Sequence, residues 1–287
     1  MVNYNQLKSA LIDCVTDISY PQSDDYYEKS SADGYAFLGA AKELLGLDST
    51  QEEKEVWNGK PYGLRKPYTI KGTVFSADTQ YLYTGWSCSL FGVLLDRKDN
   101  QGRVNRIKHS LSSLPVFEDG YAKQAISYCS PKCQYIVPNV QAMAVQLGVN
   151  KENSLNWLLS RFRRGNWKYH LRGTNKYHPQ EDGFHLAMMW FALRGLDLDK
   201  KYDMMREGLQ SNLVSMIANN YPKHHINWQH GFLALSCAQV TPLRDKCIKL
   251  AFETIQDKNS NFRAKCLNAF ALAVLSVDHE QKLFKEL

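Results

Sequence analysis

Apolar residues recur along this chain at the spacing of α-helices. In residues 3–18, for example, Leu7, Leu11 and Val15 follow one another at intervals of four, which places them on one helical face. The same period predicts twelve helices, at 3–18, 32–46, 49–58, 80–96, 102–114, 135–148, 151–163, 181–195, 200–218, 227–239, 242–257 and 261–277. Residues 60–77 break the pattern, because their Pro, Gly and β-branched residues predict a loop with a short β-like excursion.

The predicted helices alternate between two kinds. The first helix and every second one after it are amphipathic and charged. The others are apolar almost all round and rich in Ala and Gly: 32–46, 80–96, 135–148, 181–195, 227–239 and 261–277. A helix that is apolar on every side is buried on every side. We therefore expect one all-α domain over residues 1–287, in which six helical hairpins each give one helix to an outer layer and one to an inner layer.

Polar and aromatic side chains gather where the predicted inner helices begin. They include Asp33, Tyr35, Asp78, Trp86, Asn139, Glu181, Asp182, His185, Asn227, His230, Lys265 and Asn268. Inner helices that all ran in one direction would bring these starts together at one end of the domain. Taken singly, each carboxylate or amide is equally well explained as a helix cap or a first-turn acid.

Residues 161–178 form a basic loop, which holds most of the excess positive charge. The chain has 35 Lys and Arg against 29 Asp and Glu, a formal net charge of +6. The cations that follow one another here without an acid between them are Arg161, Arg163, Arg164, Lys168, Arg172 and Lys176. Guanidinium groups bind carboxylates and phosphates through paired hydrogen bonds, and nearby Trp167, Tyr169 and Tyr177 offer rings for stacking. The loop therefore predicts an anionic ligand, with a solvated connection as the alternative.

The alternation of outer and inner helices resembles the (α/α)6 toroid, the six-hairpin fold of many glycoside hydrolases and polysaccharide lyases. The resemblance covers nearly the whole chain and lies in its architecture and in its aromatic and acidic decoration. It implies an active cleft at the N-terminal ends of the inner helices. Terpenoid cyclases use a modified form of the fold, but their Asp-rich motif is absent from this sequence.

The resemblance implies an enzyme that cleaves an acidic glycan. A hydrolase needs two carboxylates across the scissile bond, and here Glu181 or Asp182 would work with Asp33 or Asp78. Arg172 would bind the negative charge of the substrate. The remaining candidate substrate-binding residues are aromatic or polar: Trp86, Trp167, Tyr169, His185, Asn227 and Trp228.

A polysaccharide lyase is the second chemistry that the resemblance implies. Asn227 and Arg172 would neutralise the uronate carboxylate, and His230 or Tyr177 would remove the proton next to it. The segment Asn227-Trp228-Gln229-His230 is similar to the Asn and His set of toroidal uronate lyases. A surface turn that ends in a buried His230 is the alternative for this segment.

A helical scaffold without catalytic activity is the alternative function. It would bind nucleic acid or another anionic partner through the basic loop, since cationic grooves with aromatic rings suit single strands. No metal and no cofactor is expected, because the His and Cys spacings match no metal motif. No apolar run is long enough for a membrane span, and the seven scattered Cys indicate thiols rather than a disulfide framework. We expect a cytoplasmic protein with no membrane partner.

Overall fold

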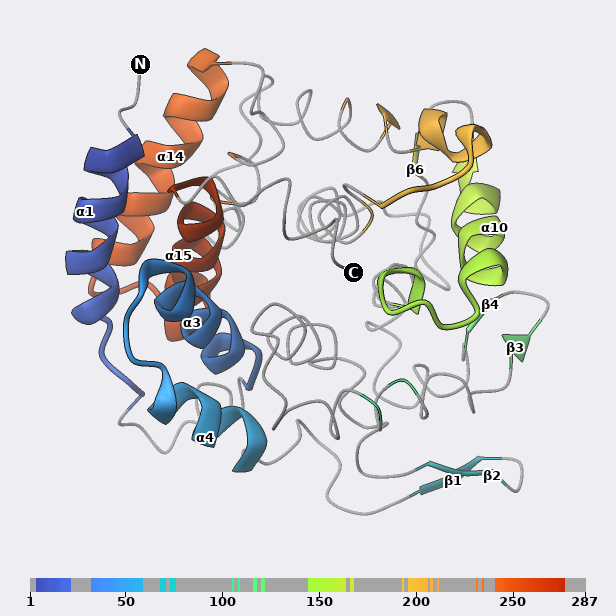
Figure 1. Ribbon diagram of the computed structural model, residues 1–287, viewed down its shortest axis with the longest axis horizontal. Helices are drawn as coiled ribbons and strands as arrows, with labels where there is room; N and C mark the ends of the chain where they lie inside the picture. The colour runs from blue at the N-terminus through green and yellow to red at the C-terminus, as the bar shows by residue number, and fades with distance from the viewer. Residues whose placement is uncertain are drawn as a thin grey trace.

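Helices dominate the computed structural model (Figure 1). It describes residues 4–21, 32–58, 68–70, 73–75, 105, 108, 116–117, 120–121, 144–163, 166–167, 193, 196–205, 207–208, 211, 231, 234 and 241–276. The helices are α1 (Tyr4–Thr16), α3 (Ala32–Leu45), α4 (Thr50–Asn58), α10 (Lys151–Arg161), α14 (Thr241–Gln256) and α15 (Phe262–Ser276), with a 3-10 turn η2 (Lys200–Tyr202). Each α-helix lies within two residues of its predicted bounds, so the helical class is confirmed for this part of the chain.

Three short antiparallel strand pairs accompany the helices. They are β1 (Tyr68–Ile70) with β2 (Thr73–Phe75), β3 (Val116–Phe117) with β4 (Gly120–Tyr121), and β5 (Phe162–Arg163) with β6 (Asn166–Trp167). The first pair lies within the range where the sequence predicts a β-like excursion. The third pair was not predicted, because the apolar Phe162 continues the helical period of α10. Helix α10 ends two residues earlier than predicted, and the basic loop opens as a hairpin.

Glycines end two of the predicted inner helices. After α3, Gly46 adopts a positive φ of 78°, its N–H donates to the Glu43 carbonyl at 3.0 Å, and the Leu47 N–H donates to the Lys42 carbonyl at 2.8 Å. This is the Schellman arrangement, which a residue without Cβ adopts at little cost. Gly148 repeats it with a φ of 70°. The sequence-predicted ends of helices 32–46 and 135–148 are thus confirmed.

A tight turn joins α14 to α15. The Asp257 carboxylate accepts hydrogen bonds from the Asn259 N–H and the Ser260 hydroxyl, and the Asn261 side-chain oxygen accepts one from the Ala264 N–H at 2.7 Å. The last bond caps the first turn of α15, where backbone N–H groups have no partner within the helix. These local bonds make α14 and α15 a helical hairpin.

Burial separates the described helices into two kinds. Residues of α15 are buried on all its faces, and α3 is buried throughout residues 36–41. Helix α1 instead buries a stripe formed by Leu7, Leu11 and Val15 and exposes its polar face. In Figure 1, α1 and α14 lie toward the edge of the molecule and α3 and α15 toward its middle. In this part of the fold the amphipathic helices α1 and α14 thus lie outside the apolar helices α3 and α15.

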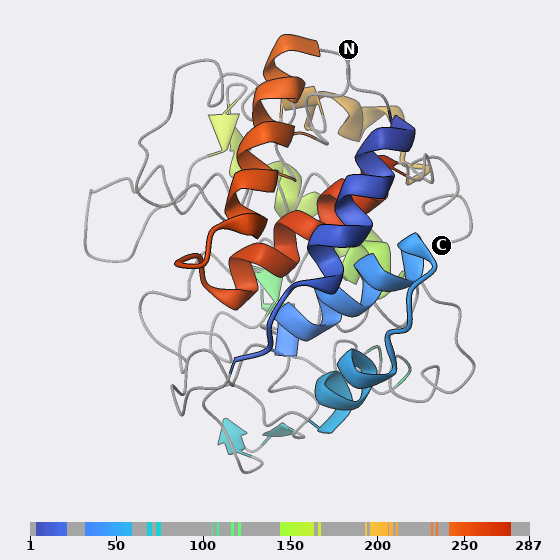
Figure 2. The same cartoon turned by 90° about the vertical axis from the view of Figure 1, so that its left-hand side faces the viewer.

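Helices α3 and α15 run in the same direction. Figure 2 shows α3 and α15 side by side and parallel, with α1 and α14 running the opposite way. The ring centroids of Tyr35 and Phe262 are 4.9 Å apart at the helix starts, and those of Phe37 and Phe270 are 5.2 Å apart further along. The hairpin nearest the N-terminus thus packs against the α14–α15 hairpin. Within the described ranges no helix is both long and apolar enough to cross a membrane.

Candidate functional site

Aromatic side chains cluster at the end where α3 and α15 begin. The Tyr20 ring, from the segment after α1, stacks on Tyr35 with centroids 6.0 Å apart and planes 16° apart. Phe262, the first residue of α15, is tilted against both tyrosines. Asp33, a candidate catalytic residue, is the second residue of α3 and so lies at the same end. The sequence pointed to Asp33 and Tyr35 here, but it did not indicate Tyr20 or Phe262.

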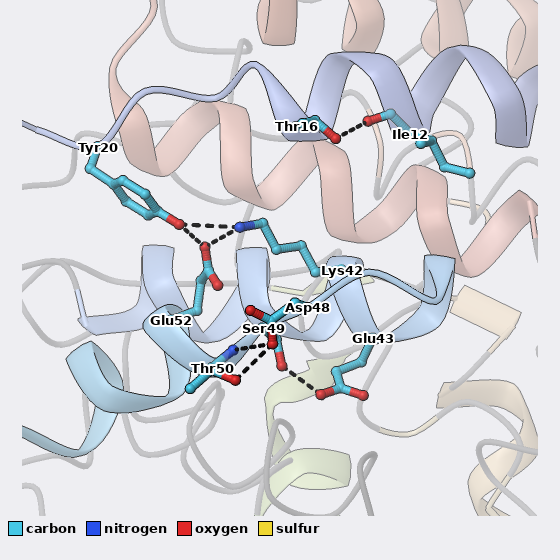
Figure 3. Close-up of polar contacts among 9 residues, drawn as sticks. All are labelled: Ile12, Thr16, Tyr20, Lys42, Glu43, Asp48, Ser49, Thr50 and Glu52. Carbon is cyan, nitrogen blue, oxygen red and sulfur yellow. Dashed lines mark hydrogen bonds and ion pairs between the residues drawn. The ribbon is translucent and has the colours of Figure 1, made fainter.

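A partly buried polar cluster joins the same tyrosine to two helices. The Glu52 side chain of α4 is 0% exposed, and its Oε1 accepts hydrogen bonds from Lys42 Nζ at 2.6 Å and from the Tyr20 hydroxyl (Figure 3). Lys42 Nζ also donates to the Tyr20 oxygen at 3.1 Å. We call Tyr20, Lys42 and Glu52 the Glu52 cluster. It joins the segment after α1 to α3 and α4.

The pKa values in the Glu52 cluster suit a structural role rather than proton transfer. Burial, aided by the hydrogen bond to Glu52, raises the pKa of Tyr20. Burial opposes the charge of Lys42, but its hydrogen bonds to Glu52 and Tyr20 prevail and raise its pKa. The tyrosine is therefore neutral and the lysine charged at neutral pH, and a general acid or base needs a pKa near the working pH. The cluster can hold chain segments together, but these two groups do not suit proton transfer.

Alkaline solution is expected to weaken this end of the fold. Burial, followed by the charge of Glu55, raises the pKa of Tyr35 from 10.0 to about 12. Between these values the unfolded phenol is ionised while the folded one keeps its proton, so the free energy of unfolding falls as pH rises from about 10 to 12. Urea denaturation at several pH values measures this fall. In Tyr35→Phe the fall should be shallower than in the wild type. Equal slopes would contradict the assignment to Tyr35.

Asn268 links α15 to the neighbouring segment that contains Gly231. Its side chain is 0% exposed. The side-chain oxygen accepts a hydrogen bond from the Gly231 N–H at 2.7 Å, and the side-chain nitrogen donates to the Ala264 carbonyl at 2.8 Å. The sequence singled out Asn268 as a polar group at an inner-helix start. In the structure both ends of its carboxamide bind protein backbone, so it does not face a ligand.

Most predicted site residues lie outside the described residues. These are Asp78, Trp86, Tyr169, Arg172, Tyr177, Glu181, Asp182, His185, Asn227, Trp228 and His230. Asp33 and Trp167 are placed by their backbone, in α3 and β6. In the part of the chain that the structure covers, no group of His, Cys, Asp and Glu could hold a metal ion. Cys266 is a buried thiol, as its apolar helix predicts.

Comparison with known proteins found no relative of this chain. No protein-family model, no curated protein and no solved structure matches it. Function is therefore inferred from the residues and their geometry alone.

Proposed function

We propose that this protein is an (α/α)6 toroid enzyme that cleaves an acidic glycan in a cleft at the N-terminal ends of its inner helices. The observation that carries the proposal is the parallel packing of α3 and α15 (Figure 2). Parallel inner helices bring their first turns to one end of the fold. Helix N-termini favour anions, because their backbone N–H groups and the helix dipole point there. A uronate carboxylate is an anion of this kind.

Layering of the described helices supports the toroid. Helices α3 and α15 are the inner pair and α1 and α14 the outer pair, and α1 contacts both α14 and α15. Contact between the two hairpins nearest the ends of the chain is what a closed ring of hairpins requires. Elsewhere the Tyr202 hydroxyl donates to Asn156 at 2.9 Å, joining η2 to α10. These residues belong to the predicted outer helices of consecutive hairpins.

Aromatic rings at the starts of α3 and α15 support a glycan rather than a small anion. Tyr20 and Tyr35 are both partly exposed and lie against each other at the end of α3 that contains Asp33. Sugar rings present apolar faces that pack on aromatic side chains. The substrate would therefore meet aromatic surface and a candidate carboxylate at the same end of the fold.

Two reactions fit the candidate residues. In hydrolysis, one carboxylic acid protonates the leaving glycosidic oxygen while a second carboxylate activates water or attacks the sugar. Glu181 or Asp182 would pair with Asp33 or Asp78 for this chemistry. In elimination, His230 or Tyr177 removes the proton next to the uronate carboxylate. The electrons of that bond form a carbon–carbon double bond, and the glycosidic oxygen leaves with a proton. Arg172 would bind the substrate carboxylate in either reaction.

Incubation of the purified chain with a panel of uronic-acid polysaccharides tests the proposal. New reducing ends alone indicate hydrolysis, and new reducing ends with new ultraviolet absorbance indicate elimination. At least one of Glu181→Gln, Asp182→Asn, His230→Gln and Tyr177→Phe should lower the rate by about 10²–10⁴-fold, the usual contribution of a general acid or base. Glu253→Gln is the matched control, because Glu253 is an exposed acid of α14.

Two outcomes would overturn the proposal. The first is the absence of product from every polysaccharide in the panel. The second is binding to single-stranded nucleic acid that weakens steeply with salt, unaccompanied by glycan cleavage. The second outcome would favour a scaffold that binds anions through residues 161–178.

A further inference from the structure

Of the three aromatic rings that meet where α3 and α15 begin, one is buried and two reach solvent. Phe262 is 6% exposed, while Tyr20 and Tyr35 are both partly exposed. The Phe262 ring centroid is 4.9 Å from that of Tyr35 and 6.3 Å from that of Tyr20. The two tyrosines therefore form the solvent-facing part of this aromatic cluster.

The two tyrosine rings form one offset surface. Their planes are 16° apart and their centroids are 6.0 Å apart. Rings that faced each other directly would be separated by about 3.5–4.0 Å, the contact distance between carbon atoms. The rings of Tyr20 and Tyr35 are therefore displaced sideways, an arrangement that aromatic pairs prefer. Each ring leaves part of the other ring's face uncovered.

The Glu52 cluster holds this surface in place. The Tyr20 hydroxyl donates to Glu52 Oε1 and accepts a hydrogen bond from Lys42 Nζ at 3.1 Å, so the side chain is fixed at its far end as well as at its backbone. Tyr35 is carried by α3, and the tilted ring of Phe262 packs against it. A surface that is fixed before binding loses little conformational entropy when a ligand packs on it.

The charges around the tyrosine pair disfavour a carboxylate. The charges of Glu52 and Glu55 reach Tyr35, and those of Glu52 and Lys42 reach Tyr20. These three groups carry two negative charges and one positive charge, and the positive charge is paired with Glu52 at 2.6 Å. A uronate carboxylate would therefore be repelled here. The hydroxyls of a neutral sugar could instead donate hydrogen bonds to Glu55, which is partly exposed.

We propose that Tyr20 and Tyr35 form a binding platform for a neutral sugar unit of the glycan. The inference rests on the proposed function for the class of ligand. A sugar ring packs its carbon-bound hydrogens on aromatic faces and keeps its hydroxyls at the edge, which matches an offset pair of rings with a carboxylate nearby. The platform narrows the substrate to a glycan in which neutral sugars accompany uronates.

Oligosaccharide binding to the full chain tests the platform separately from cleavage. Dissociation constants are measured for a panel of neutral, uronate-only and mixed oligosaccharides. Tyr35→Leu removes a ring of the platform, Tyr35→Phe keeps it, and Phe252→Leu is the matched control, since Phe252 is a partly exposed ring of the outer helix α14. We expect Tyr35→Leu to weaken binding of neutral and mixed oligosaccharides about tenfold. Tyr35→Phe and Phe252→Leu should bind as the wild type does.

Tyrosine NMR on the wild type gives a second measurement that does not depend on the folding of Tyr35→Leu. The ring signals of Tyr20 and Tyr35, assigned with Tyr20→Phe and Tyr35→Phe, should shift when a neutral or mixed oligosaccharide binds. Those of the buried Tyr202 should stay in place. The proposal is overturned if no neutral or mixed oligosaccharide binds, or if one binds without shifting these signals. Binding that depends on Tyr35, with no cleavage of any polysaccharide, would contradict the proposed enzyme and leave the platform standing.

Discussion

Lys42→Met is expected to lower the free energy of unfolding by about 3–5 kcal/mol, the usual effect of removing one partner of a buried ion pair. The variant removes the Lys42 ammonium that pairs with Glu52, and the Glu52 side chain is fully buried. Glu52 Oε2 is already buried without a hydrogen-bond partner among the described residues, so the carboxylate has little to replace the lost contact. Urea denaturation followed by circular dichroism measures the change.

Two variants make the Lys42 result specific. The double variant Lys42→Met/Glu52→Leu removes both charges and should recover most of the stability, because apolar replacement of a whole buried pair is often neutral or stabilising. Lys249→Met breaks an exposed pair with Glu253, whose charged atoms are 3.9 Å apart, and should cost less than about 1 kcal/mol. A Lys42→Met variant as stable as Lys249→Met would show that the Glu52 cluster does not stabilise the fold.

Gly231→Ala is expected to destabilise the fold by about 1–3 kcal/mol, the range for overpacking a close contact. The new methyl group would meet the Ala271 Cβ at 2.7 Å, so one of the two helical segments must move. Equilibrium urea denaturation again gives the value.

Ala271→Gly provides the matching control in a double-mutant cycle. It removes the atom that the new methyl group would meet, so Gly231→Ala should cost less in the Ala271→Gly background than in the wild type. Equal costs in the two backgrounds would mean that the segments do not approach each other as closely as the structure has them.

Helix positions in the described chain were predictable because their signals are local. The period of apolar residues, the glycines after α3 and at 148, and the Asn261 cap all act within a few residues of the element they define. The β5–β6 hairpin was missed for the same reason, because Phe162 fits the period of the preceding helix equally well. Short strands that depend on a partner leave no period long enough to recognise.

The Glu52 cluster could not be predicted, because its members are distant in sequence. In the segment Gln51-Glu52-Glu53-Lys54-Glu55, every acid has the character of a solvated residue in the first two turns of an amphipathic helix. Which of them is buried depends on Lys42 and Tyr20, which reach Glu52 from other segments. Asn268 presents the same difficulty, since an amide on an apolar helix can face a cavity or a neighbouring backbone.

The proposed function requires the starts of the inner helices to meet at one cleft. A crystal structure of the full chain with a bound uronic-acid oligosaccharide is the most direct measurement. Four side chains decide the outcome: Arg172, Glu181, His185 and His230. We predict that all four line a single cavity at the end where α3 and α15 begin, with the oligosaccharide in it. Side chains that point away from one another, with the sugar bound elsewhere, would contradict the proposed enzymatic function.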